Sequence, residues 1–117
     1  MKKIAILPAA ACLIGQAALA HALLDRASPA VGSEASGSPP ALNLAYTEPV
    51  EPLFSSIRVT DASGMRVDEG TPFTQQGGRL LSVKLKPLPP GVYAVEWHVT
   101  SVDTHKTDGR FTFTVKP

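Results

Sequence analysis

The chain has 117 residues, which is enough for one small domain with a single hydrophobic core. Its 11 Lys and Arg residues nearly balance its 10 Asp and Glu residues. This balance gives no electrostatic reason to expect nucleic acid or an anionic membrane surface as a partner.

The first 20 residues have the organisation of a signal peptide. Lys2 and Lys3 precede the uncharged residues 4–20, and Ala18-Leu19-Ala20 places small residues where signal peptidase accepts them. The stretch is broken by Pro8 and falls short of the ~20 apolar residues that a spanning helix needs. We therefore predict a signal peptide over residues 1–20, export to the periplasm, and a mature domain that does not insert into the membrane.

Cleavage after residue 20 determines which chemistry the mature domain can perform. It removes Cys12, the only cysteine, and leaves nine basic against ten acidic residues, a net charge of −1. A metal ion in residues 21–117 must then be bound by nitrogen and oxygen donors, with thioether as the one soft alternative. Lipoprotein processing at Cys12 is the competing interpretation, and it would leave His21 inside the chain.

Short strands separated by turn residues are predicted throughout the mature domain. Alternating apolar residues and turn signals predict strands over 21–26, 42–46, 56–61, 79–85, 91–101 and 109–115, with a further short one over 65–67. Residues 27–40 and 73–78 are predicted loops, and 61–64, 87–91 and 107–109 are predicted turns. About seven strands without helical periodicity predict an all-β, immunoglobulin-like sandwich.

The strongest predicted strand, 91–101, places four apolar side chains on one face. Tyr93, Val95, Trp97 and Val99 are assigned to the core, whereas His98 lies on the polar face and is predicted to be a surface residue. If Trp97 lies within reach of a bound transition-metal ion, the ion is expected to quench the tryptophan emission.

Asp103 and His105 follow this strand and are separated by one residue. If the chain stays extended past Ser101, their side chains project from the same side. A carboxylate beside an imidazole is a common ligand pair for a divalent transition metal. The alternative is that Asp103 caps a turn and His105 is a solvated loop residue.

His21 would become the amino terminus of the mature chain. Its α-amine and its Nδ1 could then close one chelate ring on a metal ion. With His105 and Asp103 this makes three nitrogen donors and one oxygen donor, a set that suits tetragonal Cu(II), whereas Zn(II) prefers a tetrahedron. The alternative for His21 is a frayed terminus without a role.

With these features the chain resembles the CopC-type periplasmic copper-binding proteins of copper resistance and copper uptake. The resemblance covers nearly all of the mature chain. It is carried by the signal peptide that ends before His21 and by these segments: Leu42-Asn-Leu-Ala-Tyr-Thr-Glu48, Leu88-Pro-Pro-Gly-Val-Tyr93, Val95-Glu-Trp97, Ser101-Val-Asp-Thr-His105 and Gly109-Arg-Phe-Thr-Phe-Thr-Val115.

The resemblance implies a Greek-key β-sandwich or barrel that holds one Cu(II) ion per chain. The implied ligands are His21, Asp103 and His105. Glu48 matches an acidic position of the family and is implied as a weak axial or outer-shell carboxylate, with Glu51 ranked below it. An inner-membrane copper transporter of the CopD type is the implied partner.

Some members of this family have a second, Cu(I) site rich in methionine. Met65 is the only methionine in residues 21–117, and a soft-ligand site needs several thioethers or thiolates. We therefore predict a Cu(II) site only.

Three functions remain open from the sequence. The first is a Cu(II)-binding protein that sequesters or delivers copper for resistance and homeostasis and catalyses no reaction. The second is a copper-dependent monooxygenase, because such enzymes also bind copper through an amino-terminal histidine and another histidine. The third is a metal-free immunoglobulin-like interaction domain.

Overall fold

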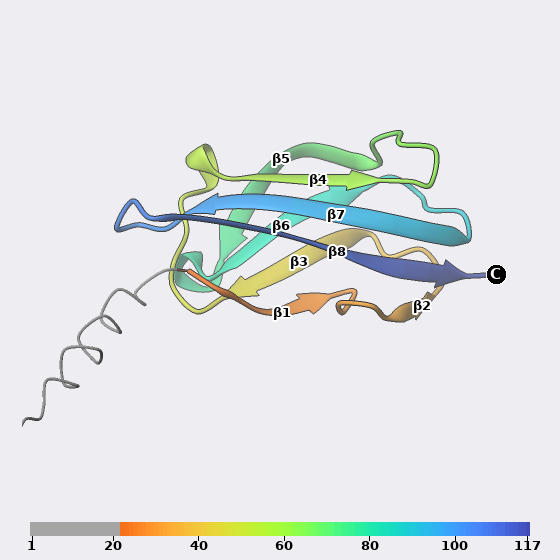
Figure 1. The fold of residues 1–117 in the computed structure, drawn as a ribbon, viewed down its shortest axis with the longest axis horizontal. Helices are drawn as coiled ribbons and strands as arrows, with labels where there is room; N and C mark the ends of the chain where they lie inside the picture. The colour runs from red at the N-terminus through yellow and green to blue at the C-terminus, as the bar shows by residue number, and fades with distance from the viewer. Residues whose placement is uncertain (1–21) are drawn as a thin grey trace, which may run out of the picture.

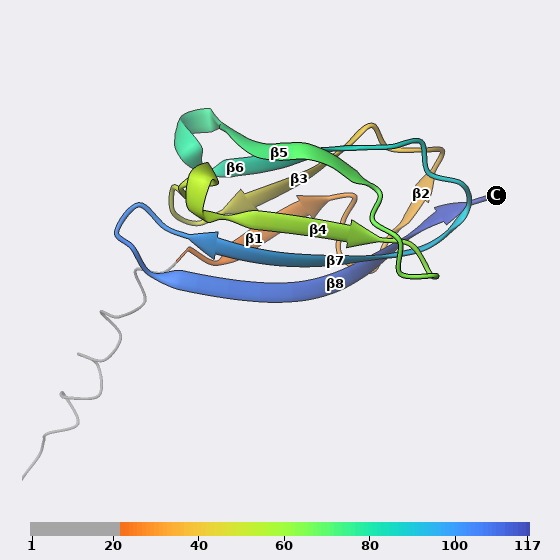
Figure 2. The ribbon, with the colours of Figure 1, turned by 90° about the horizontal axis from the view of Figure 1, so that it is seen from above.

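A computed structural model describes residues 22–117 and shows two β-sheets packed face to face (Figures 1 and 2). The predicted signal peptide, its cleavage site and His21 lie outside the described residues. Among the residues that are described, no helix is long and apolar enough to cross a membrane.

Each sheet contains four strands. In the first sheet the order is β1 (Leu24–Ser28), β3 (Ala41–Tyr46), β6 (Leu80–Leu85) and β5 (Asp68–Gln75), and all neighbours are antiparallel. In the second sheet it is β2 (Glu34–Ser36), β8 (Lys106–Lys116), β7 (Gly91–Thr100) and β4 (Ser56–Thr60), with β2 parallel to β8. Two single 3₁₀ turns, η2 (Pro52–Phe54) and η3 (Gln76–Gly78), complete the described elements. The predicted all-β, immunoglobulin-like sandwich is confirmed.

The core lies between the sheets and is built by alternating side chains. Strand β7 buries Tyr93, Val95, Trp97 and Val99, as its pattern predicted. The other strands contribute Leu42, Leu44, Ile57, Val59, Leu81, Val83, Leu85, Phe113 and Val115. The Trp97 ring stands edge-on to Tyr46 with centroids 5.3 Å apart.

Two edge strands were not predicted. Strand β5 covers residues 68–75, although 73–78 were expected to form a loop. Gly70 and Pro72 weaken its strand pattern, and its pairing with β6 shifts register between Glu69 and Phe73, an irregularity that an edge strand tolerates. Strand β2 has only three residues, too few for an alternating pattern to be recognised, and β1 begins at Leu24 rather than at residue 21.

The prediction of a turn at residues 107–109 is wrong. These residues are already in β8, where Thr107 pairs with Val99, Asp108 with His98 and Gly109 with Trp97. Gly109 serves packing here: a Cβ atom at this position would lie 2.5 Å from Cζ2 of the Trp97 ring. The reversal between β7 and β8 is five residues long, from Ser101 to His105.

Candidate metal centre

The β7–β8 turn, residues 101–105, holds two of the predicted ligands. The Ser101 N–H donates to the His105 carbonyl (2.8 Å), and the Thr104 N–H donates to the Ser101 carbonyl (2.8 Å). Thr104 has a φ of 73°, in the left-handed region that β-branched residues rarely adopt. The expectation of an extended Asp103-Thr-His105 segment is therefore wrong, because the chain closes a tight turn at this point.

Turn closure nevertheless brings Asp103 and His105 together. Nδ1 of His105 lies 3.4 Å from Oδ1 of Asp103, and the two side chains are 53% and 46% exposed. An imidazole nitrogen and a carboxylate oxygen therefore sit side by side at the surface, where a metal ion can approach them directly.

A hydrogen bond from Ser101 holds the Asp103 carboxylate. Ser101 is only 1% exposed, and its hydroxyl donates to Oδ1 of Asp103. The Ser101 hydroxyl oxygen also accepts a hydrogen bond from the backbone N–H of His105 (3.3 Å). The hydrogen bond from Ser101 and the neighbouring His105 lower the pKa of Asp103, which keeps the carboxylate ionised as a metal ligand requires.

The segment that follows β3 runs alongside this turn. Val50 and Ser101 form an isolated β-bridge, and the Val102 N–H donates to the Pro49 carbonyl (3.1 Å). Glu48 is half-buried in this segment. Within residues 22–117, however, no three His, Cys, Asp or Glu side chains form a group that could hold a metal ion. Neither Glu48 nor Glu51 therefore completes a three-ligand group with Asp103 and His105.

The described chain also begins at this end of the sandwich (Figure 1). Ala22 is 1% exposed, and its carbonyl accepts a hydrogen bond from Oγ1 of Thr107 (2.7 Å), two residues after His105. His21, the remaining predicted ligand, is bonded directly to Ala22 but lies outside the described residues.

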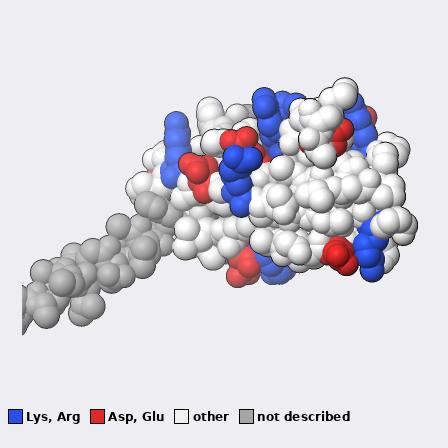
Figure 3. All heavy atoms as spheres, turned by 45° about the vertical axis from the view of Figure 1, so that its right-hand side comes forward, with Lys and Arg blue, Asp and Glu red and all other residues white. Residues whose placement is uncertain are grey.

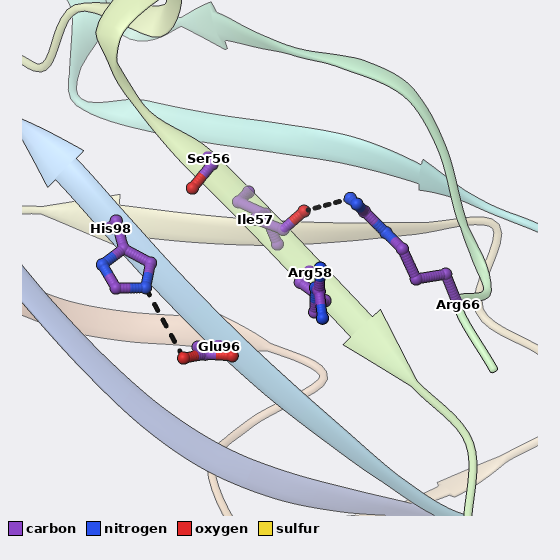
Figure 4. A pocket seen from close by; sticks show the side chains of 6 residues that line it. All are labelled: Ser56, Ile57, Arg58, Arg66, Glu96 and His98. Atoms are coloured by element: carbon purple, nitrogen blue, oxygen red, sulfur yellow. Dashed lines mark hydrogen bonds and ion pairs between the residues drawn. The ribbon is translucent and has the colours of Figure 1, made fainter. Parts of the chain in front are cut away.

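His98 lies apart from the turn, on the outer face of the second sheet. Its Nε2 is 3.5 Å from Oε2 of Glu96, and its side chain is exposed, as predicted. The two side chains line an open pocket of about 370 Å³ with Ser56, Ile57, Arg58 and Arg66 (Figure 4). Glu96 is the one acidic side chain in this lining, beside the two arginines, so the pocket carries charges of both signs.

Charged side chains are mixed elsewhere as well. On the face drawn in Figure 3, acidic and basic side chains are interspersed, without a broad area of one sign. On this face the distribution agrees with the balanced composition and shows no basic patch for a polyanion.

Comparison with known proteins identifies relatives of the whole domain. The CopC domain family matches residues 24–116. The protein YobA of Escherichia coli K12 is 37% identical over 106 residues, which cover 89% of this chain and 86% of YobA. The copper transport protein CutJ of Bacillus subtilis is 36% identical over 98 residues, which cover 82% of this chain but only 18% of CutJ.

A solved structure shows the same fold. The crystal structure of CopC from Methylosinus trichosporium OB3b superimposes with a TM-score of 0.77 and 34% sequence identity, over 83% of this chain and 95% of that one.

Proposed function

Because the chain belongs to the CopC family, we propose that it is a periplasmic protein that binds one Cu(II) ion and sequesters or delivers it in copper resistance and homeostasis. Copper is the cargo of this protein rather than a reagent, so function requires binding and release but no catalysed step. The observation that carries the proposal is the exposed pair of Asp103 and His105, 3.4 Å apart at the end where Ala22 is anchored.

The donor set that we propose consists of three nitrogens and one oxygen. His21, freed by signal-peptide cleavage, supplies its α-amine and Nδ1, and His105 and Asp103 complete the set. Such a mixture in a tetragonal arrangement suits Cu(II). Glu48 is proposed as an outer-shell carboxylate, because the segment that contains it runs beside the β7–β8 turn.

The position of Met65 supports a Cu(II) site without a Cu(I) site. It lies in the connection between β4 and β5, at the end of the second sheet where β7 begins, because Thr60 pairs with Ala94. Strand β7 has ten residues and spans roughly 30 Å, so the only thioether is remote from Asp103 and His105. No second thioether is present in residues 22–117.

Burial of the Trp and Tyr side chains supports binding over polysaccharide oxidation, while Phe54 and Phe73 are exposed aromatic residues of the described chain. The only Trp and both Tyr residues, Trp97, Tyr46 and Tyr93, are buried in the core. A sugar-oxidising enzyme needs an aromatic surface on which its substrate can stack, and these residues cannot supply one.

We propose a CopD-type copper transporter as the partner. In the relative CutJ the matched domain is a small part of a long copper transport protein, which supports the view that such domains work next to a transporter. An apolar rim of Leu53 (89% exposed), Phe54 (73%) and Val102 (53%) flanks the β7–β8 turn. Thr100 Oγ1 donates to the Phe54 carbonyl (2.9 Å), which fixes η2 against the end of β7.

The decisive experiment uses protein exported from its native precursor. Mass spectrometry is expected to find His21 as the first residue, and titration with Cu(II) is expected to give one equivalent bound. His105→Ala is expected to weaken binding by orders of magnitude, whereas His98→Ala, the matched histidine control on β7, is expected to bind as wild type does. Equal losses in the two variants, or no copper retained by the wild type, would contradict the proposal.

A further inference from the structure

Hydrogen bonds hold the backbone directly after His21 to both sheets. Oγ1 of Thr107, at the start of β8 in the second sheet, donates to the Ala22 carbonyl (2.7 Å). The two residues are 85 positions apart in the chain, so this contact joins segments that no local structure would bring together.

The first sheet holds the same segment from its other side. The Leu23 N–H donates to Oγ1 of Thr47 (3.0 Å), and the Thr47 N–H donates to the Leu23 carbonyl (2.9 Å). The guanidinium of Arg79, the residue before β6, donates to the Thr47 carbonyl and so holds Thr47 against the first sheet. Ala22 itself is part of the buried core cluster.

We propose that Thr47 and Thr107, the terminal clamp, are positioning residues of the copper site. This inference rests on the proposed function, in which two of the four donor atoms belong to the residue bonded to Ala22. Consecutive Cα atoms are about 3.8 Å apart, so fixing Ala22 confines the residue before it to a small volume. A confined ligand loses less conformational entropy when it binds, and affinity rises accordingly.

The clamp also links the ligands to one another. Thr107 is two residues from His105 on the same stretch of chain, so a displacement of the β7–β8 turn would move the hydroxyl and the imidazole together. We therefore expect the clamp to limit how far Ala22, and with it the amino-terminal donors, can move relative to the turn donors.

Thr107→Val is the direct test, because valine keeps the β-branched shape that suits a strand and lacks the hydroxyl donor. One lost hydrogen bond has a net effect of roughly 0.5–1.5 kcal/mol, which corresponds to a Cu(II) affinity about two- to twelvefold lower. Thr107→Ser, which keeps the donor, is expected to bind as wild type does. Thr112→Val, the same change at an exposed position farther along β8, is the matched control.

Amide hydrogen exchange in the metal-free mature protein provides a readout that is independent of copper. Thr47→Val removes the acceptor of the Leu23 N–H, and Thr107→Val loosens the adjacent Ala22, so both are expected to speed exchange at Leu23. Faster exchange with unchanged copper affinity would overturn the inference and leave the proposed function intact. Failure of the wild-type protein to bind copper would instead overturn the proposed function, and this result is obtained before any variant is measured.

Discussion

Gly109→Ala is predicted to destabilise the domain, because Gly109 lies against the buried Trp97 ring. The added Cβ would lie 2.5 Å from Cζ2, 2.7 Å from Cε2 and 3.0 Å from Nε1 of the indole, so the ring or β8 has to move. Trp97 is 6% exposed and packs edge-on against Tyr46, which leaves the ring little room. Overpacking of a core costs about 1–3 kcal/mol. The lower flexibility of alanine in the unfolded chain offsets about 0.5–1 kcal/mol of this cost.

The net loss expected for Gly109→Ala is about 0.5–2 kcal/mol. For a domain of this size, that lowers the melting temperature by roughly 2–16 °C. Equilibrium unfolding in urea, followed by far-UV circular dichroism, is expected to show a lower midpoint with an unchanged slope. A double-mutant cycle with Trp97→Leu provides the control, because the smaller side chain leaves room for the Cβ and removes most of the penalty. Wild-type stability of Gly109→Ala would refute the packing role assigned to this glycine.

Four further predictions concern the site and the pH dependence of folding. Ser101→Ala removes the hydrogen bond that lowers the pKa of Asp103, so Cu(II) binding, measured by titration across acid pH, is expected to fail at a higher pH than in wild type. One extra residue before His21 converts the α-amine into an amide, so the Cu(II) affinity is expected to drop by orders of magnitude; equal affinity would refute the ligand assignment. The pair of substitutions Leu53→Ser and Phe54→Ser is expected to leave Cu(II) affinity unchanged but to slow copper transfer to the transporter. Burial alone would raise the pKa of Asp68, but hydrogen bonds from Arg66 and from the Val59 N–H lower it. Asp68 therefore stabilises the fold above its ordinary pKa and loses this contribution as the pH falls through the lowered value, so urea unfolding of Asp68→Asn is expected to show a weaker acid dependence than wild type.

The sequence predicted the interior strands because their two faces differ sharply. Strand β7 alternates apolar and polar residues from Val95 to Thr100, and in β6 the inward Leu81, Val83 and Leu85 are separated by Ser82 and Lys84. Strand β5 has no such contrast, since both its faces are largely exposed and Gly70 and Pro72 interrupt it. Its strand conformation depends on pairing with β6, which is information that a local pattern does not contain.

Gly109 shows why the turn was misplaced. Thr107-Asp108-Gly109 has the composition of a turn, and glycine in such a setting usually supplies a positive φ. In this fold the glycine is required because the Trp97 ring, on the neighbouring strand, occupies the space of a side chain. The local sequence does not distinguish a glycine needed for a turn from a glycine needed for packing. The register between β7 and β8 distinguishes them, because it places Gly109 opposite Trp97.

Asp103 and His105 lie side by side as predicted, although for a different geometric reason, and their role as metal ligands stays a prediction. An extended chain was expected to align them, whereas the five-residue turn brings them to within 3.4 Å. The residue that orients the carboxylate, Ser101, was visible in the motif but had no assigned role. No local pattern pointed to the terminal clamp, because Thr47, just after β3, and Thr107, in β8, have a proposed role that depends on contacts across the fold.

The proposed turn ligands lie at the surface rather than in the core. Asp103 and His105 are about half exposed, and the buried hydroxyl of Ser101, which donates to Asp103, links their turn to the interior. Substituting an exposed ligand is therefore expected to leave the packing between the sheets intact. Substituting a neighbour of Trp97 leaves the ligands present but is expected to destabilise the domain that carries them. Copper affinity and unfolding free energy are thus expected to respond to different residues. Ser101 is the exception, because its hydroxyl contacts the ligand turn while its backbone pairs with Val50, and a change there is expected to alter both quantities.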